Sequence, residues 1–165
     1  MNQEQLRKIK LLILDVDGVL TDGKIYMSAL GEETIAFFVR DGLGMQMLQS
    51  IGVPIAIISG RNTPAVMHRL KKLGIQQQHI YLGHLDKVAS YEKLLSDLKI
   101  SPDEVAYVGD DLPDIAVMRQ VGLSFAVADA MESVKKNATQ TTEKKGGKGA
   151  VREVCDLIYN AKVAA

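Results

Sequence analysis

The feature that most constrains the fold of this chain is a series of short apolar runs. Each run is followed by turn residues and then by a longer stretch with helical spacing. The runs do not alternate between apolar and polar residues, so they predict strands that are buried on both faces. Buried strands that alternate with helices are typical of a Rossmann-like α/β fold, in which helices cover both faces of a parallel sheet in three layers. We expect strands at Leu11–Leu14, Val53–Ile58, Ile80–Leu82, Val105–Val108 and Leu123–Val127, and helices at about 42–51, 63–73, 86–98, 113–121 and 150–162.

One segment, at about residues 23–40, interrupts this alternation after the first strand. Lys24–Ser28 and Thr34–Val39 are rich in β-branched and aromatic residues and flank Gly31, which predicts a β-hairpin. An isolated hairpin is marginally stable in water, and this one carries more apolar surface than a free arm should expose. We therefore expect the hairpin to pack against neighbouring subunits of a homo-oligomer. The alternative is that it folds back on its own domain.

Length and composition set the broad class. The 165 residues are enough for one domain, spanning residues 1–165, with a sizeable core. Twenty basic and twenty acidic residues cancel, which indicates neither a nucleic-acid partner nor an anionic membrane surface. No apolar stretch approaches the roughly 18–20 residues of a membrane span, and the N-terminal apolar run is too short for a signal peptide. The single cysteine, Cys155, suits a core position and a reducing compartment, so we expect a cytoplasmic protein.

Two of the predicted strands end in carboxylates. Asp15 and Asp17 follow the first strand, and Asp110 and Asp111 follow the fourth, with Asp114 nearby. Clustered carboxylates repel one another and resist loss of solvent unless a cation joins them. A hard divalent ion with oxygen ligands fits this requirement, and in proteins Mg²⁺ commonly binds together with a phosphate.

Further polar residues should converge on the same place, because ligands of an open parallel sheet bind beyond the carboxyl ends of its strands. Ser59, Gly60 and Arg61 follow the second strand, and Lys87 begins the third helix. Two carboxylates, a hydroxyl, a lysine and a second acidic cluster suit phosphoryl transfer to a carboxylate.

Each residue type has a physical role in that reaction. Asp15 would attack phosphorus as the nucleophile, and Asp17 would protonate the leaving alkoxide and then deprotonate the attacking water. Ser59 would hydrogen-bond a phosphate oxygen, and Lys87 would offset the charge of the transition state. Mg²⁺ would be held by Asp15, Asp110 and the backbone carbonyl of Asp17.

These residues resemble the four motifs of the haloacid dehalogenase superfamily of phosphohydrolases. The first motif appears as Asp15-Val-Asp-Gly-Val-Leu-Thr-Asp22, the second as Ser59, the third as Lys87 and the fourth as Gly109-Asp-Asp-Leu-Pro-Asp114. They occur in order on predicted strand ends. The resemblance implies the fold of that superfamily, and the space between the first strand and the first helix holds a hairpin and no cap domain.

The chain is further similar to the capless 3-deoxy-D-manno-octulosonate 8-phosphate (KDO 8-phosphate) phosphatases. This similarity rests on the hairpin and on four further segments: Val39–Gly44, Ser59–Arg61, Ala126–Ala130 and Gly146–Glu153. It implies an Mg²⁺-dependent step in lipopolysaccharide precursor synthesis, carried out by a homotetramer whose hairpins form a central barrel and whose sites are roofed by neighbours. The implied substrate-binding residues are Asp17, Phe38, Val39, Arg40, Asp41, Gly42, Ser59, Gly60, Arg61, Arg69 and Lys87.

Other interpretations stay open at this point. Many such phosphatases carry a basic residue where this chain has Gln46, so a nonulosonate 9-phosphate phosphatase is the alternative within the family. A phosphoacceptor switch and a scaffold that has lost catalysis are alternatives of another class. Asp22 and Asp114 fit helix caps or supporting groups, and Asp111 is expected to support the site. The Gly146–Gly149 segment is either a flexible lead into the last helix or a place where Lys148 and Arg152 meet an anion.

Overall fold

The sheet of the computed structural model, which describes residues 2–164, extends outward from β1 (Leu11–Leu14), whose four residues are all buried. All of its strands are parallel, in the order β5-β4-β1-β6-β7-β8. The five predicted strands are all present, which confirms the α/β fold. The two-residue β8 was not predicted, because it has no apolar run. The remaining strands are β4 (Ile55–Ser59), β5 (Ile80–Leu82), β6 (Val105–Gly109), β7 (Leu123–Ala126) and β8 (Gln140–Thr141).

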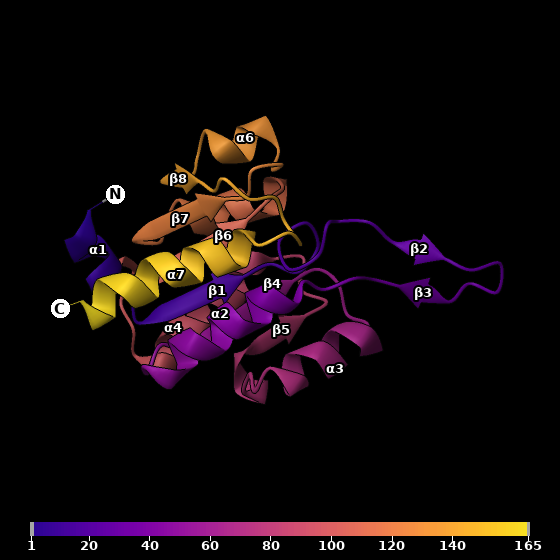
Figure 1. The fold of residues 1–165 in the computed structure, drawn as a ribbon, viewed down its shortest axis with the longest axis horizontal. Coiled ribbons are helices and arrows are strands. Elements are labelled where there is room, and N and C mark those ends of the chain that lie inside the picture. The colour runs from indigo at the N-terminus through magenta and orange to yellow at the C-terminus, as the bar shows by residue number, and fades with distance from the viewer. Residues whose placement is uncertain (1, 165) are drawn as a thin grey trace.

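Helices cover both faces of this sheet (Figure 1). From β1 the chain first proceeds toward one edge of the sheet, through β4 to β5. It then crosses back over β1 and proceeds toward the opposite edge, through β6 to β7. Because such crossovers are right-handed, α2 and α3 cover one face and α4 and α5 cover the other. The last helix, α7, lies beside α2 and also contacts α1. The helices are α1 (Gln3–Lys8), α2 (Val39–Ser50), α3 (Pro64–Lys72), α4 (Lys87–Leu98), α5 (Ile115–Met118), α6 (Glu132–Lys135) and α7 (Ala150–Val163), with 3₁₀ turns η1 (Gln77–His79), η2 (Pro102–Glu104) and η3 (Leu112–Asp114).

Two helices differ from the prediction. The helix expected at 42–51 begins three residues earlier, at Val39. The helix expected at 113–121 consists of the 3₁₀ turn η3 followed by the four-residue α5. Short 3₁₀ turns are common at helix N-termini, and they do not change the apolar pattern enough for sequence to reveal them. The short α1 and α6 were also missed, because four to six residues are too few to display a helical period.

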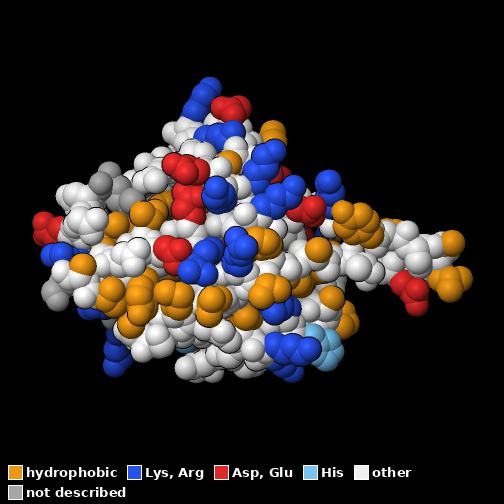
Figure 2. Space-filling model, viewed as in Figure 1, with side chains coloured by type: hydrophobic (Ala, Val, Ile, Leu, Met, Phe, Trp, Pro, Cys, Tyr) orange, Lys and Arg blue, Asp and Glu red, His pale blue; other side chains and the backbone are white. Residues whose placement is uncertain are grey.

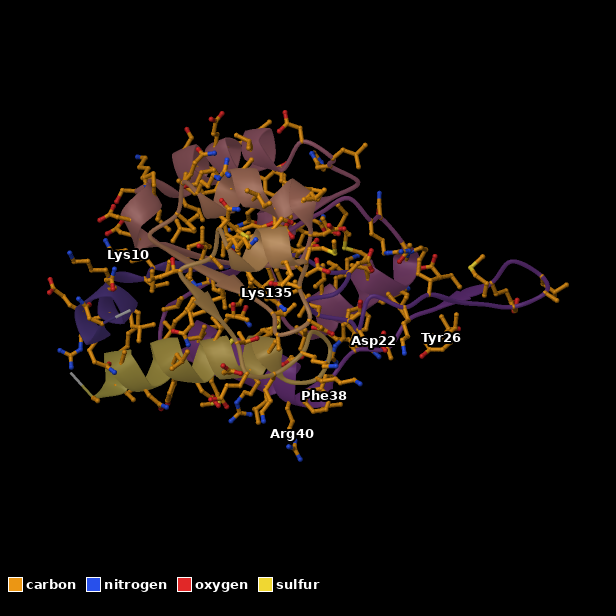
Figure 3. The ribbon with its side chains drawn as sticks, turned by 90° about the horizontal axis from the view of Figure 1, so that it is seen from above. Lys10, Asp22, Tyr26, Phe38, Arg40 and Lys135 are labelled. Atoms are coloured by element: carbon orange, nitrogen blue, oxygen red, sulfur yellow. The ribbon has the colours of Figure 1, made fainter. Side chains whose placement is uncertain are left out.

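The hairpin is shorter than predicted and stands away from the domain (Figures 1 and 2). Its paired residues are only Tyr26–Met27 (β2) and Glu33–Thr34 (β3). The apolar side chains of its outer part are exposed, with Met27 63% and Leu30 87% accessible. Tyr26, labelled in Figure 3, shows the same separation from the body of the molecule. The hairpin therefore does not fold back on its own domain.

The insertion is anchored at its base. Ile35 and Phe37, which follow β3, are half-buried and pack against the main core. Between β1 and α2 the chain forms only this hairpin and its loops, so within residues 2–164 there is no cap domain at this position. Among the same residues, no helix is both long enough and apolar enough to cross a membrane.

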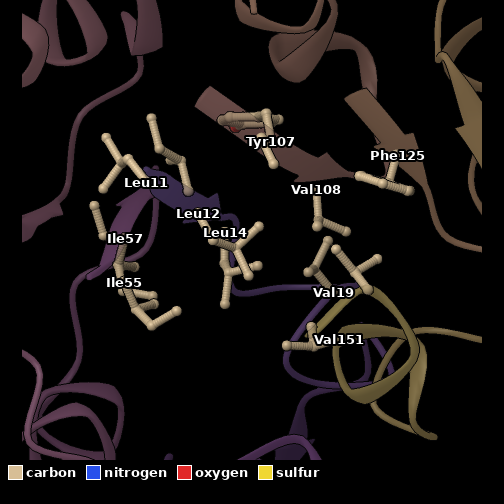
Figure 4. Close-up of a cluster of buried hydrophobic side chains, with 14 of the residues drawn as sticks. Leu11, Leu12, Leu14, Val19, Ile55, Ile57, Tyr107, Val108, Phe125 and Val151 are labelled. Atoms are coloured by element: carbon tan, nitrogen blue, oxygen red, sulfur yellow. The ribbon is translucent and has the colours of Figure 1, made fainter. Parts of the chain in front are cut away.

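The core lies between the sheet and its helices. Figure 4 shows the strand residues Leu14 and Val108 on the side of the sheet where Val19 and, from α7, Val151 also lie. All of these side chains are fully buried. Cys155 also lies in this core and is 1% exposed, as expected. The packed sheet fixes the positions of its strand ends, and the strand order reverses between β4 and β6, on either side of β1.

Candidate active site

A cavity of about 320 Å³ lies at the carboxyl ends of β1, β4 and β6, where ligands of such a sheet are expected. The four residues assigned catalytic roles from sequence, Asp15, Asp17, Ser59 and Lys87, all line it. Asp110, the expected metal ligand from β6, lies on the same wall, as do Gly60 and Arg61. The structure therefore brings together residues from four separate parts of the chain.

Lys87 joins the two acidic clusters. It is the first residue of α4, which Asp86 caps by accepting hydrogen bonds from the backbone of Val88 and Ala89. The Nζ atom lies 3.0 Å from Asp15 Oδ1 and 2.7 Å from Asp114 Oδ1. The lysine is 6% exposed. Burial alone would lower the pKa of Lys87, but its two carboxylate partners raise the pKa overall, so the ammonium stays charged.

Asp114 supports the site and does not face it with a free oxygen. Its Oδ1 accepts hydrogen bonds from Lys87 and from the hydroxyl of Tyr107, at 2.7 and 2.6 Å. Its Oδ2 accepts from the backbone N–H groups of Asp110 and Asp111, at 2.9 and 3.1 Å. The residue is fully buried. The carboxylate thus fixes the loop after β6, in keeping with the supporting role expected from sequence.

The two acidic residues predicted to be peripheral make only local contacts. Asp111 caps η3 by accepting a hydrogen bond from the N–H of Leu112 at 2.7 Å. Asp22 accepts from the N–H of Lys24 at 3.1 Å in a tight turn, and no helix begins there. The interpretation of Asp22 as a helix cap is therefore wrong.

Asp15 and Asp110 form a pair suited to a cation. Each lies with Asp114 in a cluster whose carboxylate oxygens are within 4.8 Å of one another. Burial raises the pKa of Asp15 to about 6, and burial together with the charge of Asp15 raises the pKa of Asp110 to about 8. Because both oxygens of Asp114 already accept two hydrogen bonds, Asp15 and Asp110 are the members with oxygens left for an ion. This donor set fits Mg²⁺, which prefers carboxylate and carbonyl oxygens.

The turn after β1 brings these groups together. The N–H groups of Val19, Leu20 and Thr21 all donate to the carbonyl of Val16, which closes a tight loop directly after Asp15. Gly18 lies in this loop with a φ of +76°, and a Cβ there would lie 1.9 Å from Asp110 Oδ2. Only glycine allows both the left-handed backbone and this close approach.

Arg61 connects Asp17 to the hairpin. Its Nε donates to Asp17 Oδ2, and its Nη1 donates to Oε1 of Glu33 at 2.8 Å. These carboxylates raise the pKa of Arg61, with the Asp17 hydrogen bond as the largest cause. Ser59, at the end of β4, is 1% exposed and accepts a hydrogen bond from the N–H of Arg61 at 3.2 Å. In this arrangement the expected acid/base carboxylate already has a cationic partner.

The remaining predicted substrate residues do not line this cavity. Phe38 is the N-cap residue of α2, and Val39, Arg40, Asp41 and Gly42 form its first turn. Phe38 and Arg40 line a second cavity of about 390 Å³ beside α7, and Figure 3 shows Arg40 pointing outward.

Asp41 and Arg69 are also directed elsewhere. The carboxylate of Asp41 is buried and accepts a hydrogen bond from the N–H of Arg152 at 2.8 Å, at the start of α7. Burial raises the pKa of Asp41 to about 6. The guanidinium of Arg69 lies 6.0 Å from the ring centroid of Phe37 and against Gly42. Within one chain, the predicted substrate residues thus form two separate groups.

Sequence reasoning gave His84 only a minor chance of lining the cavity, and it did not consider Leu85 or the hairpin residue Glu33. His84 and Leu85 belong to the loop between β5 and Lys87, and Leu85 is 84% exposed at the mouth. Their position just before Lys87 was the available signal, because that loop ends at the same edge of the sheet. Glu33 had no signal, since its contact with Arg61 depends on where the hairpin lies.

Comparisons with known proteins agree with this geometry. Residues 78–154 match the haloacid dehalogenase-like hydrolase family. The chain is 50% identical over 159 residues to the 3-deoxy-D-manno-octulosonate 8-phosphate phosphatase of Yersinia pestis, covering 96% of this chain and 84% of the relative. It is 51% identical over 154 residues to the enzyme of the same name from Escherichia coli, covering 93% and 81%.

Solved structures give the same result. The Yersinia pestis phosphatase superposes with a TM-score of 0.94 over 98% of this chain and 86% of that one. The phosphatase of Moraxella catarrhalis, solved with magnesium, phosphate and KDO, is 43% identical and superposes with a TM-score of 0.93, covering 98% and 91%. With this identity over nearly the whole chain, and with the four motifs gathered around one cavity, the chain belongs to the 3-deoxy-D-manno-octulosonate 8-phosphate phosphatase family of haloacid dehalogenase-like hydrolases.

Proposed function

We propose that the protein hydrolyses KDO 8-phosphate to KDO and inorganic phosphate, a step in lipopolysaccharide precursor synthesis. The observation that carries this proposal is the buried Asp15 carboxylate, held 3.0 Å from Lys87 in a cavity that also contains Asp17, Ser59 and Asp110. The resemblance in sequence and the product KDO in the Moraxella catarrhalis structure support the substrate. We place the reaction in the cytoplasm, with which the lone buried Cys155 is compatible.

The chemistry follows from the side chains. Asp15 attacks phosphorus to form an aspartyl phosphate, and the bond between phosphorus and the sugar oxygen breaks as Asp17 gives that oxygen a proton. Asp17 then takes a proton from the water that attacks the same phosphorus, and phosphate leaves as the Asp15 carboxylate re-forms. Lys87 and Ser59 stabilise the charge on the phosphoryl oxygens. Arg61 must exchange its contact with Asp17 for one with the substrate before proton transfer.

Mg²⁺ completes the site in this proposal. Asp15, Asp110 and the backbone carbonyl of Asp17 are the groups that would hold it. When bound, the ion neutralises phosphate oxygens and so allows one anion to approach another.

The two separate groups of substrate residues favour an oligomer. Asp17, Ser59, Gly60, Arg61 and Lys87 line the cavity of one chain, whereas Phe38–Gly42 and Arg69 lie outside it. We infer that Phe38–Gly42 and Arg69 approach the site of a neighbouring subunit in a homotetramer. The exposed apolar residues of the hairpin and of the outer face of α2, such as Val39 and Leu43, support such contacts (Figure 2).

The oligomer is tested by charging the hairpin. Met27→Glu should reduce the mass found by light scattering and should lower activity. Met27 is 63% exposed in the single chain, and the substitution places a carboxylate on the apolar surface that we expect to meet a neighbouring subunit. Val163→Glu is the matched control, since Val163 is also exposed, at 52%, but lies near the C-terminus of α7. A monomeric native protein, or equal effects of the two variants, would contradict the tetramer.

The substrate is tested by phosphate release from a panel of sugar phosphates. We expect kcat/KM for KDO 8-phosphate to exceed that for nonulosonate 9-phosphates and neutral hexose phosphates by at least about tenfold. A chelator should abolish activity and added Mg²⁺ should restore it. Preference for the nine-carbon acids would favour the alternative suggested by the uncharged Gln46, which is exposed on α2. Preference for a hexose phosphate would overturn the substrate and leave the reaction class intact.

Alternatives of another class are less favoured. A phosphoacceptor switch must preserve its acyl phosphate, whereas Asp17 lies in the same cavity as Asp15, two residues along the chain, where it can activate water. A scaffold that has lost catalysis need not keep Asp15, Asp17 and Lys87 together.

A further inference from the structure

The Gly146–Gly147 segment lies directly against the loop that carries the catalytic carboxylates. A Cβ at Gly146 would lie 1.6 Å from the carbonyl oxygen of Gly18, and a Cβ at Gly147 would lie 2.4 Å from the backbone nitrogen of Asp22. The N–H of Gly147 also donates to the carbonyl of Val19 at 3.0 Å. Backbone therefore packs on backbone here, with no space for a side chain.

The Gly146–Gly147 segment is itself hydrogen-bonded to the loop after β7. The N–H of Gly146 donates to Asp129 Oδ1 at 2.9 Å. The carbonyl of Lys144 accepts hydrogen bonds from the N–H of Ala128 at 3.1 Å and from the hydroxyl of Thr142 at 2.6 Å. The contacts with Ala128 and Asp129 attach this segment to the loop that follows β7, a strand of the main sheet.

The start of the same segment is also tied to α7. The carboxylate of Glu153 accepts hydrogen bonds from the N–H groups of Glu143 and Lys144, at 2.9 and 3.0 Å. The start of α7 is tied in turn to α2 through Asp41 and the N–H of Arg152. Gly146 and the residues before it are thus well anchored, which contradicts a flexible lead into α7, whereas anion binding by Lys148 and Arg152 stays a prediction.

Gly18 is confined between this support and the second acidic cluster. On one side its carbonyl contacts Gly146, and on the other its Cα faces the carboxylate of Asp110. A shift of Gly18 by a few tenths of an ångström would move the adjoining peptide of Asp17 relative to Asp15 and Asp110. These are the groups to which we assign Mg²⁺, so support from the Gly146–Gly147 segment acts on the metal geometry.

We propose that Gly146 and Gly147 are positioning residues that set the loop of residues 15–22 for binding Mg²⁺ and for phosphoryl transfer. They act through the backbone of Gly18, Val19 and Asp22 and do not touch the substrate. The proposal rests on the proposed metal-dependent reaction, and it adds a requirement located about 130 residues along the chain from the nucleophile.

The test compares two glycines with similar packing. Gly146→Ala introduces a Cβ against the Gly18 carbonyl, and Gly122→Ala is the matched control, because its Cβ would lie 2.3 Å from the carbonyl of Asp103, outside the cavity lining. Neither glycine has a positive φ, so the comparison isolates close contact. Thermal unfolding measures the stability of each variant, and calorimetry measures its Mg²⁺ affinity. Phosphate-release assays give kcat and the Mg²⁺ concentration at which the rate is half-maximal.

Both alanine variants should lose stability, but only Gly146→Ala should weaken Mg²⁺ binding, by about tenfold or more, with a fall in kcat. If Gly146→Ala does not fold, Asp129→Ala replaces it, since it removes the acceptor of the Gly146 N–H from an exposed position. That variant should weaken Mg²⁺ binding severalfold. Wild-type Mg²⁺ affinity and kcat in the folded variant, or equal losses in Gly122→Ala, would overturn the proposal. Because calorimetry needs no substrate, failure of the proposed substrate would leave this test valid.

Discussion

The Asp15→Asn variant should fold normally and release no phosphate from KDO 8-phosphate in the presence of Mg²⁺. The amide cannot act as the nucleophile, so the fall in kcat should be at least about 10⁴-fold, as for other enzymes that lose the nucleophile. Folding should survive because Lys87 keeps its second partner, Asp114, at 2.7 Å. The neutral amide also removes a carboxylate whose burial raises its pKa to about 6, so stability without Mg²⁺ should be equal or higher.

Asp22→Asn is the matched control for this variant. Asp22 belongs to the same sequence motif, but within residues 2–164 its carboxylate accepts a hydrogen bond only from the N–H of Lys24, which an asparagine oxygen also accepts. Activity should therefore stay within a few-fold of the wild type. Circular dichroism and thermal unfolding establish that both variants are folded, and a phosphate-release assay gives kcat. Persistent Mg²⁺-dependent turnover by folded Asp15→Asn would rule out Asp15 as the nucleophile.

Sequence predicted the parts of this protein that depend on strand order and strand ends. The apolar runs at Leu11–Leu14 and Val105–Val108 are strands, and because parallel strands end at one edge, their carboxylates had to meet. The same reasoning placed Ser59 and Lys87 at the cavity. No side-chain contact was needed for these predictions, only the direction of the chain.

Other features depend on contacts that have no sequence signal. The pairing of Arg61 with Glu33 depends on where β3 of the hairpin lies relative to the loop after β4. The role of Gly146 depends on the position of a loop about 130 residues from Gly18, and glycine-rich composition alone suggested flexibility. Phe38–Gly42 were assigned to the substrate from resemblance, and one chain leaves them outside the cavity, so their assignment depends on the proposed oligomer.

The Asp114→Ala variant should lose roughly 3–5 kcal/mol of unfolding free energy, the usual effect of removing one partner of a buried ion pair. Four donors lose their acceptor together: Lys87, the hydroxyl of Tyr107, and the N–H groups of Asp110 and Asp111. A buried donor without a partner is costly because it has also lost water. Activity should fall as well, because the loop that presents Asp110 loses its anchor and Lys87 keeps only Asp15.

Asp111→Ala separates this effect from a general loss of charge in the acidic cluster. Asp111 is the next acidic residue before Asp114, but it is exposed, and its side chain caps η3 by accepting a hydrogen bond from the N–H of Leu112. Its removal should cost about 1 kcal/mol, the usual value for a helix cap. Urea unfolding of the two variants measures the difference. If the two variants lost equal amounts of unfolding free energy, Asp114 would contribute no more than an ordinary helix cap. Other contacts would then have to fix the loop after β6. A much larger loss for Asp114 would show that this one buried carboxylate, through four hydrogen bonds, holds both the loop after β6 and the Lys87 side chain in place.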